Sequence, residues 1–395
     1  MTRSAADSCP GVLRLHEAAD GPLARIRVPG GLLAPAQVQA LAEAAHDLAD
    51  GNIELTSRGN VQLRQVRDAG ALTDRLTAAG LLPSATHDRV RNIVASPLSG
   101  RIGGLADVHP LVSALDAGLL AAPRLADLPG RVLFTLDDGR GDVSGLGGDI
   151  GVHAVGPDEF ALLLAGGDSG LRLPAADAVD VMLAAAHAFL ELRGDDAGRW
   201  RLRDIEHGAE RVADGLGRSP VAERLEFPAA PGIPIGWLEQ DDGSVALGAG
   251  VRLGSLPART AEFLAAVERP VLVTPWRSLV VTDLAEWTAE QVVRVLAPMG
   301  LIFDADSPWL LVSACAGQPG CAKSRTDVRA DAADAVGTGR VLPRVADPAD
   351  RARTMPAPDV AVAGRQHWSG CDRRCGRPQG EVTDVVATDD GYRVD

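Results

Sequence analysis

Residues 52–66 read NIELTSRGNVQLRQV and predict two short antiparallel strands joined by a tight turn. Four apolar residues alternate with polar ones on either side of Gly59 and Asn60, the period of a strand with one buried face. They are Ile53, Leu55, Val61 and Leu63. A helix is expected before this hairpin, over residues 33–51, because a proline lies near its start and a glycine at its end. A second helix is expected at about residues 70–80.

The same order of elements recurs in the second half of the chain. A helix is expected over residues 257–268, then strands in PVLVTPWRSLVV (270–281), then a helix at about 288–299. The matching landmarks lie 218 to 220 residues apart: Thr56 and Arg58 with Thr274 and Arg277, Gly80 with Gly300, and Pro97 with Cys315. This constant offset predicts a duplicated unit of about 200 residues, the alternative being a coincidental order of common elements.

Four of the five cysteines form two pairs near the C-terminus. Cys315 and Cys321 lie in SACAGQPGCAKS, and Cys371 and Cys375 lie in HWSGCDRRCGRP. This spacing suits a 4Fe–4S cluster, in which each iron takes one soft thiolate ligand. It differs from the closer pairs usual at structural zinc sites, although zinc and unliganded core cysteines stay open as alternatives. Cys9 lies outside the motif and is expected to be an ordinary thiol.

Composition narrows the class of protein. The chain has 395 residues and a net charge of −14, which argues against nucleic acid as a partner. No stretch approaches 18 uninterrupted apolar residues, so we expect no membrane span. The N-terminal residues lack the apolar run of a signal peptide, and five cysteines are too few for a disulfide scaffold. We therefore expect a cytoplasmic protein.

LTSRGNVQLR (55–64), VRNIVASPLSGR (90–101) and the cysteine set together resemble the nitrite/sulfite reductase superfamily, from about residue 8 to 380. Within it, SCPGVLRL (8–15) and PIGWLEQDDGSVALGAGVRLG (234–254) are similar to the precorrin-3B synthase family of aerobic cobalamin biosynthesis. The resemblance implies an α+β fold with a duplicated architecture, in which ferredoxin-like half-domains are joined by two tetrapyrrole-binding lobes.

The resemblance also implies a division of the chain. The expected units are a first half-domain at 12–70, a first lobe at 71–213, a linker at 214–232, a second half-domain at 233–287, and a second lobe with the cysteines at 288–395.

The activity implied is the oxygen-dependent conversion of precorrin-3A to precorrin-3B, a C20 hydroxylation with lactone formation. The implied cofactors are a 4Fe–4S cluster and a mononuclear non-haem iron, and a separate reductase would supply electrons. The alternatives are a sulfite or nitrite reductase, which would also bind siroheme, and a non-catalytic tetrapyrrole carrier.

By the same resemblance, Arg27, Arg58 and Arg91 match positions that hold tetrapyrrole carboxylates in the reductases. Arg131 falls where the reductases have the first of two proton-feeding lysines and is expected, like the other three arginines, to bind the substrate. Leu133 falls near the second lysine position. Arginine suits this task because its planar, always charged fork pairs with carboxylates. Each arginine alone could instead belong to a solvated face.

The remaining candidates are histidines. His367 is expected to hydrogen-bond a cluster sulfur, to bind iron, or only to pack its loop. No histidine pair identifies the ligands of the non-haem iron, and Asp149 with His153, in a glycine-rich turn, is a weak guess.

Overall fold

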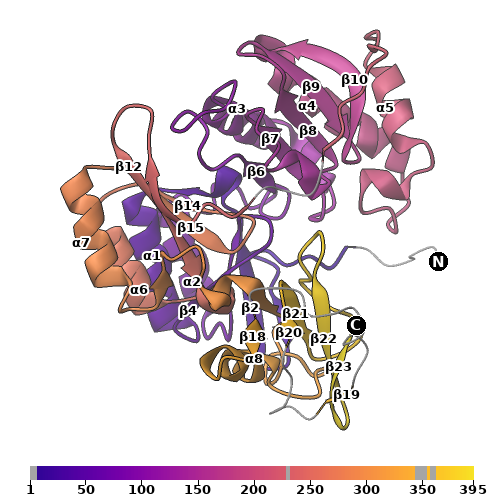
Figure 1. Ribbon diagram of the computed structural model, residues 1–395. Helices are drawn as coiled ribbons and strands as arrows, with labels where there is room; N and C mark the ends of the chain where they lie inside the picture. Colours follow the sequence, from indigo (N-terminus) through magenta and orange to yellow (C-terminus); the bar gives the residue numbers. More distant parts are fainter. Residues whose placement is uncertain (1–6, 228–231, 343–353, 356–361) are drawn as a thin grey trace.

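The computed structural model describes residues 7–227, 232–342, 354–355 and 362–395. Two central sheets with their helices form one side of the molecule, and two lobes lie beside them (Figure 1). The first lobe is the magenta part of the ribbon, and the second lobe is the yellow part. This arrangement is the duplicated α+β architecture that the sequence predicts.

Each central sheet takes an edge strand from the opposite half of the chain. The first sheet consists, in spatial order, of β1 (His16–Ala18), β2 (Gly21–Ile26), β5 (Val61–Leu63), β4 (Asn52–Leu55) and β13 (Ser255–Pro257). The second consists of β11 (Gly236–Glu239), β12 (Val245–Val251), β15 (Ser278–Leu284), β14 (Val271–Val273) and β3 (Leu32–Leu33), with β16 (Leu301–Ile302) beside β12. Because β13 pairs with β4 and β3 pairs with β14, neither half completes its sheet alone.

Four helices cover the central sheets and share one hydrophobic core. They are α1 (Pro35–Leu48), α2 (Ala69–Ala78), α6 (Ala258–Ala265) and α7 (Glu286–Leu296), and they confirm the four predicted helices. Since α2 and α7 add Leu72, Leu76, Val292 and Leu296 to this core, each half-domain extends beyond the predicted boundaries at residues 70 and 287. None of the helices described is long and apolar enough to cross a bilayer.

The two lobes repeat one strand pattern. The first contains β6 (Ile93–Ala95), β7 (Phe134–Asp137), β8 (Ile150–Ala154), β9 (Glu159–Leu164), β10 (Gly167–Pro174), α3 (His109–Ala121), α4 (Ala175–Arg193) and α5 (Gly208–Gly215). The second contains β17 (Val312–Ala314), β21 (Gln366–Ser369), β22 (Thr383–Thr388), β23 (Gly391–Val394), β19 (Thr354–Met355) and α8 (Val328–Gly337), with the pair β18 (Val341–Leu342) and β20 (Val362–Ala363). In both lobes three parallel strands are followed by an antiparallel one.

The hairpin turns fix the register of the repeat and correct part of the predicted matching. Thr56 bonds the carbonyl of Asn60 through its amide, and Thr274 bonds the carbonyl of Ser278 in the same way. Counting between these bonds, Arg277 occupies the place of Gly59, with φ of 58° and 64°, and Trp276 occupies the place of Arg58. The predicted pairing of Arg58 with Arg277 is therefore off by one residue.

The lobe strands correct a second match. The amide of Ser96, just after β6, bonds the carbonyl of Leu136, and the amide of Cys315, just after β17, bonds that of Trp368. Cys315 thus corresponds to Ser96 and not to Pro97.

Candidate functional site

The two cysteine pairs meet because their strands are parallel neighbours. β17 pairs with β21 in a register that sets Val312 opposite Gln366. Parallel neighbours present their carboxyl ends at the same edge of a sheet. The loop after β17 carries Cys315 and Cys321, and the loop after β21 carries Cys371 and Cys375. The sheet therefore joins segments that are 49 residues apart in the sequence.

All four thiols are free, and the other three act electrostatically on Cys375. Burial, together with the neighbouring Cys315, Cys371 and Cys321, raises the pKa of the Cys375 thiol. Among the described residues, no three cysteine sulfur atoms lie within 4.8 Å of one another. Sulfur ligands of one tetrahedral zinc ion would lie about 3.8 Å apart, given a zinc–sulfur bond of about 2.3 Å. The four cysteines therefore do not form a ready zinc site, and soft thiolates are the ligands of an iron–sulfur centre.

The surroundings of the cysteines are polar and ordered by hydrogen bonds. The amide of Gly370 donates to Cys315 Sγ at 3.3 Å. His367 lies 3.2 Å from the carbonyl oxygen of Cys375 through Nε2 and 2.9 Å from Ser313 Oγ through Nδ1. Burial and the nearby Arg277 lower the pKa of His367 to about 4, so its imidazole is neutral near pH 7. The expected contact of His367 with sulfur is replaced by a contact with the backbone of a cysteine.

A cavity of about 460 Å³ opens beside the cysteines, between the two halves of the chain. Gly376, the residue after Cys375, belongs to its wall. The first half contributes Arg58, Leu133, Leu146, Arg201 and Arg203, and the second half contributes Trp276, Arg277, Trp309, Arg377 and Gln379. A cavity with apolar and aromatic walls and several guanidinium groups suits a large anionic molecule.

Arg58 is the predicted arginine that the structure brings into this cavity. It stands in the turn between β4 and β5, and its Nη1 donates to the carbonyl of Arg131 at 3.0 Å. Burial and the neighbouring Arg201 lower the pKa of Arg58 to about 10. Burial and the neighbouring Arg329 also lower the pKa of Arg277. These guanidinium groups stay charged at neutral pH, and a bound carboxylate would relieve their desolvation and mutual repulsion.

The other predicted arginines have partners inside the protein and do not line the cavity. Arg91 makes a two-pronged ion pair with Asp116 on α3, at 2.6 and 2.7 Å. Arg131 pairs with Asp7 at 3.0 Å and lies over the ring of Trp200. The motif identified these arginines in the sequence, but it did not predict the aspartates that pair with them in the folded protein.

Arg27 is the most buried of the predicted arginines, with 2% of its surface exposed. It donates to the carbonyls of Arg89 and Pro10 and to Cys9 Sγ. Burial lowers the pKa of Arg27 to about 10. Arg27 is not among the residues that line the cavity, so the structure does not bring it to the expected ligand. Cys9 is buried beside Arg27 and is not part of the cysteine group.

Several cavity residues were not expected from the sequence. Arg201 pairs with Asp149 at 2.5 Å, and both Arg201 and Arg203 donate to the carbonyl of Gly147 at 2.7 Å. They lie in RWRLR (199–203), a dense run of arginines in an acidic chain. That run is the signal that could have identified them.

Asp149 and His153 bind separate partners in the first lobe. Asp149 accepts from the amides of Leu133 and Leu202 and pairs with Arg201. His153 contacts Ser144 Oγ at 3.0 Å and Asp137 at 3.3 Å. Their polar atoms serve different partners, so the guess of a shared metal is not supported.

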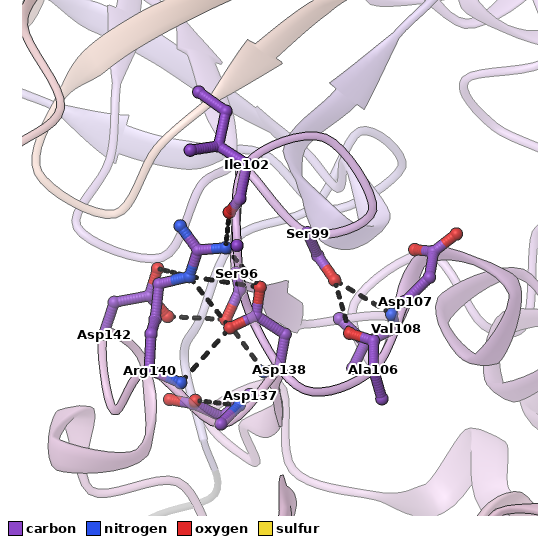
Figure 2. Close-up of polar contacts among 12 residues, drawn as sticks. Ser96, Ser99, Ile102, Ala106, Asp107, Val108, Asp137, Asp138, Arg140 and Asp142 are labelled. Carbon is purple, nitrogen blue, oxygen red and sulfur yellow. Dashed lines mark hydrogen bonds and ion pairs between the residues drawn. The ribbon is translucent and has the colours of Figure 1, made fainter. Parts of the chain in front are cut away.

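An acidic group lies deeper in the first lobe, around Arg140 (Figure 2). Among the described residues, Asp137, Asp138 and Asp142 offer carboxylate oxygens that lie within 4.8 Å of one another. Arg140 Nη2 donates to Asp138 at 2.6 Å and to the carbonyl of Ile102 at 2.6 Å. This guanidinium supplies positive charge among the three carboxylates and binds Asp138 most closely.

Comparison with known proteins first shows which architecture the chain shares. The family model of the nitrite/sulfite reductase ferredoxin-like half domain matches residues 16–79, which contain β1 to α2. The solved structure of Mycobacterium tuberculosis NirA superimposes with a TM-score of 0.72 at 19% identity, covering 100% of this chain and 78% of that one. The chain thus has the architecture of the nitrite/sulfite reductases and carries their ferredoxin-like half domain.

Among curated proteins, the chain is similar to a precorrin-3B synthase from Sinorhizobium sp. The two are 25% identical over 395 residues, which cover 98% of this chain and 81% of the relative. A ferredoxin–nitrite reductase from Synechococcus elongatus is 26% identical over 419 residues, covering 92% of this chain and 75% of the relative. The resemblance predicted from the sequence is confirmed, because the chain is similar both to a precorrin-3B synthase and to a nitrite reductase.

Proposed function

We propose that the protein converts precorrin-3A to precorrin-3B with molecular oxygen. One oxygen atom would enter the C20 hydroxyl of the lactone product, and the other would leave as water after two electrons and two protons are delivered. The observation that carries this proposal is the near full-length similarity to precorrin-3B synthase. The arginine-lined cavity beside four free thiols supports it.

The cavity residues would hold the substrate through its acetate and propionate groups. Arg58 and Arg201 come from the first half of the chain and Arg277 from the second, so charge is offered from both sides. Each charge-assisted hydrogen bond to a carboxylate would contribute about 1.5–3 kcal/mol of binding free energy. The indoles of Trp276 and Trp309 add apolar wall against a flat macrocycle.

Cys315, Cys321, Cys371 and Cys375 would hold a 4Fe–4S cluster. Their soft thiolates fit this group, and Gly370 already donates a hydrogen bond to Cys315 Sγ. When bound, the cluster supplies single-electron transfer. Because Gly376 adjoins Cys375 and lines the cavity, electrons would have only a short distance to travel. We further propose that a separate reductase delivers them.

The mononuclear non-haem iron that the resemblance implies does not fit the residues at the cavity. Among the described residues, the one group of three converging metal-ligating side chains is Asp137, Asp138 and Asp142. None of these aspartates lines the cavity, and Arg140 already binds Asp138. No step of the proposed reaction is assigned to this iron.

A siroheme-dependent nitrite or sulfite reductase is the second candidate, favoured by the similarity to nitrite reductases over most of the chain. Proton supply to such a reaction argues against it. The single lysine, Lys323, is exposed on the cysteine loop and does not line the cavity. Leu133, near the second expected lysine position, is apolar and does line it.

The deciding experiment supplies reconstituted protein with precorrin-3A, a reductant and isotopically labelled oxygen. We expect label in the hydroxyl of a lactone product, and only a broad iron–sulfur absorption in the purified protein. Bound siroheme with sulfite or nitrite turnover and no label would establish the second candidate instead. Precorrin binding without oxygen consumption would identify a carrier.

A further inference from the structure

The first central sheet turns one polar face toward the cysteine loops of the second lobe. Glu54 on β4 lies opposite Gln62 on β5, and Gln62 lies opposite Arg25 on β2. The three side chains form a hydrogen-bonded row, since Gln62 Nε2 donates to Glu54 at 3.2 Å and Arg25 Nε donates to Gln62 at 2.9 Å. The alternating residues Leu55 and Leu63 face the hydrophobic core on the other side.

Arg64, which follows β5, reaches the first cysteine loop directly. Its Nη2 donates to the carbonyl oxygen of Gly320 at 2.9 Å, one residue before Cys321. The same guanidinium is fixed by Asp20, through Nε at 2.8 Å and Nη2 at 2.6 Å. One arginine therefore joins the first half-domain to the residue that precedes a cluster cysteine.

A second arginine holds the start of the same loop. Arg329 on α8 donates through Nε to the carbonyl of Cys315 at 3.2 Å and through Nη1 to Glu54 at 2.5 Å. Glu54 also lies 3.9 Å from Arg64. Glu54 thus lies between Arg329, which binds the backbone of Cys315, and Arg64, which binds the residue before Cys321.

Core stability alone does not require this arrangement. The side chains of Arg64, Asp20 and Glu54 are only 7–8% exposed. Replacing buried ion pairs by well-packed apolar residues is often neutral or stabilising. The approach to the loop is also close, because a Cβ on Gly320 would lie 2.6 Å from Arg64 Nη2. Residues outside a metal site often orient its ligands by hydrogen bonds, and the arginines that donate to the backbone carbonyls of the cysteine loop are placed to do this.

We infer that Arg64, braced by Asp20 and Glu54, is a positioning residue for the iron–sulfur cluster, acting across the boundary between the two halves of the chain. It holds the loop of Cys315 and Cys321 in its ligating shape and places positive charge beside the negative thiolates. This role rests on the cluster assignment of the proposed function. Loss of the arginine loosens the cluster and makes its reduction less favourable.

The test compares reconstituted wild-type protein with Arg64→Gln, Arg64→Lys and the control Arg67→Gln. Arg67 is exposed and donates to the carbonyls of His46 and Asp47, away from the cysteines. For Arg64→Gln we expect about 10-fold faster loss of the cluster to an iron chelator, with a lower midpoint potential and an altered electron paramagnetic resonance signal. Arg64→Lys keeps the positive charge but loses the two-pronged guanidinium. Its midpoint potential should therefore stay close to that of the wild type, while its cluster should still be lost faster.

Thermal unfolding of the metal-free variants shows whether Arg64→Gln folds. If it does not, Gly320→Ala serves instead, because its new methyl group pushes the guanidinium from the carbonyl while keeping every charge. A wild-type protein that takes up no iron and sulfide would overturn the proposed function and this role with it. If the wild type binds a cluster and the folded variants match its lifetime and potential, the role of Arg64 is overturned while the proposed function stands.

Discussion

The two lobes build on the same strands but fasten their loops by different chemistry. In the first lobe, Arg140 in the loop after β7 binds Asp138 and reaches the carbonyl of Ile102 in the loop after β6. In the second lobe, the equivalent loops after β21 and β17 each carry a cysteine pair. A cation bound by carboxylates thus stands where the other lobe presents four thiols.

The register of the repeat explains this difference residue by residue. Ser96 holds the place of Cys315, and its hydroxyl donates to Asp142 at 2.5 Å. Asp137 ends β7 and accepts hydrogen bonds from four backbone amides of its loop, those of Gly139, Gly141, Val143 and Ser144. The first lobe therefore closes its loops with its own charges. The second would close them with the proposed cluster, and only that arrangement carries electrons.

The sharpest way to break the comparison is to remove one cysteine ligand. Cys315→Ser replaces a soft thiolate with a hydroxyl that binds iron poorly, so we expect iron and sulfide content to fall at least about 10-fold. Cys9→Ser is the matched control, because Cys9 is buried beside Arg25 and Arg27 and away from the cysteine group. Equal iron and sulfide in both variants would contradict the cluster assignment.

The corresponding change in the first lobe is Arg140→Ala. It leaves Asp138 fully buried without its partner, which should cost about 3–5 kcal/mol of unfolding free energy. Urea unfolding of the purified protein measures this. The control is Arg218→Ala, which breaks a half-exposed pair with Asp177 and should cost under about 1 kcal/mol. Cluster content should be unchanged in both, and an Arg140→Ala protein as stable as the control would refute the fastening role.

The sequence predicted those parts of the fold whose signals are local. The hairpin around Gly59, the helices beside it and their repetition depend on short periodic patterns, and the structure contains all of them. The one-residue errors at Arg277 and Cys315 arose because an offset of residue numbers cannot locate a turn bond or the end of a strand. Strand exchange between the halves left no local pattern, since β3 and β13 are two and three residues long.

The sequence predicted the part of the site whose residues lie close together in the chain. The cysteines sit in two short loops, whereas the cavity arginines come from five separate segments. Arg91 carries the same motif signal as Arg58, yet Asp116, 25 residues away on α3, neutralises it. A side chain's partner in the folded protein decides whether its charge is free for a ligand, and a single sequence does not specify that partner.

A third prediction sharpens the comparison between the equivalent turns of the half-domains. Arg58 and Trp276 occupy matching positions and both line the cavity. Arg58→Ala should weaken binding of a porphyrin with peripheral carboxylates by about 1.5–3 kcal/mol, roughly 10- to 100-fold. Trp276→Ala should also weaken binding, but by a factor that changes little with salt, because the substitution removes apolar contact and not charge. Fluorescence titration at two ionic strengths measures both, and identical salt dependence would count against the division of roles.

The smallest expected effect concerns the pH dependence of the first lobe. Burial and the neighbouring Asp137 raise the pKa of Asp142 to about 7, from an ordinary value of 3.8. The folded protein therefore holds this proton more tightly than the unfolded chain does. The stability gained is fully present below about pH 4 and is lost as the pH rises through about 7.

Asp142→Asn tests this because asparagine is neutral at every pH and keeps an oxygen that can accept from Ser96. The variant should lose less stability than the wild type between pH 5 and pH 8, with a difference of about 1–3 kcal/mol at the alkaline end. Urea unfolding at several pH values measures it, and Asp177→Asn, at an exposed pair, controls for the change in net charge. Parallel curves for wild type and Asp142→Asn would mean that the carboxyl is already ionised at pH 5. The lobe would then hold three buried negative charges around Arg140 instead of two, and its loops would be fastened against a larger charge repulsion than the comparison with the thiol-bearing lobe assumes.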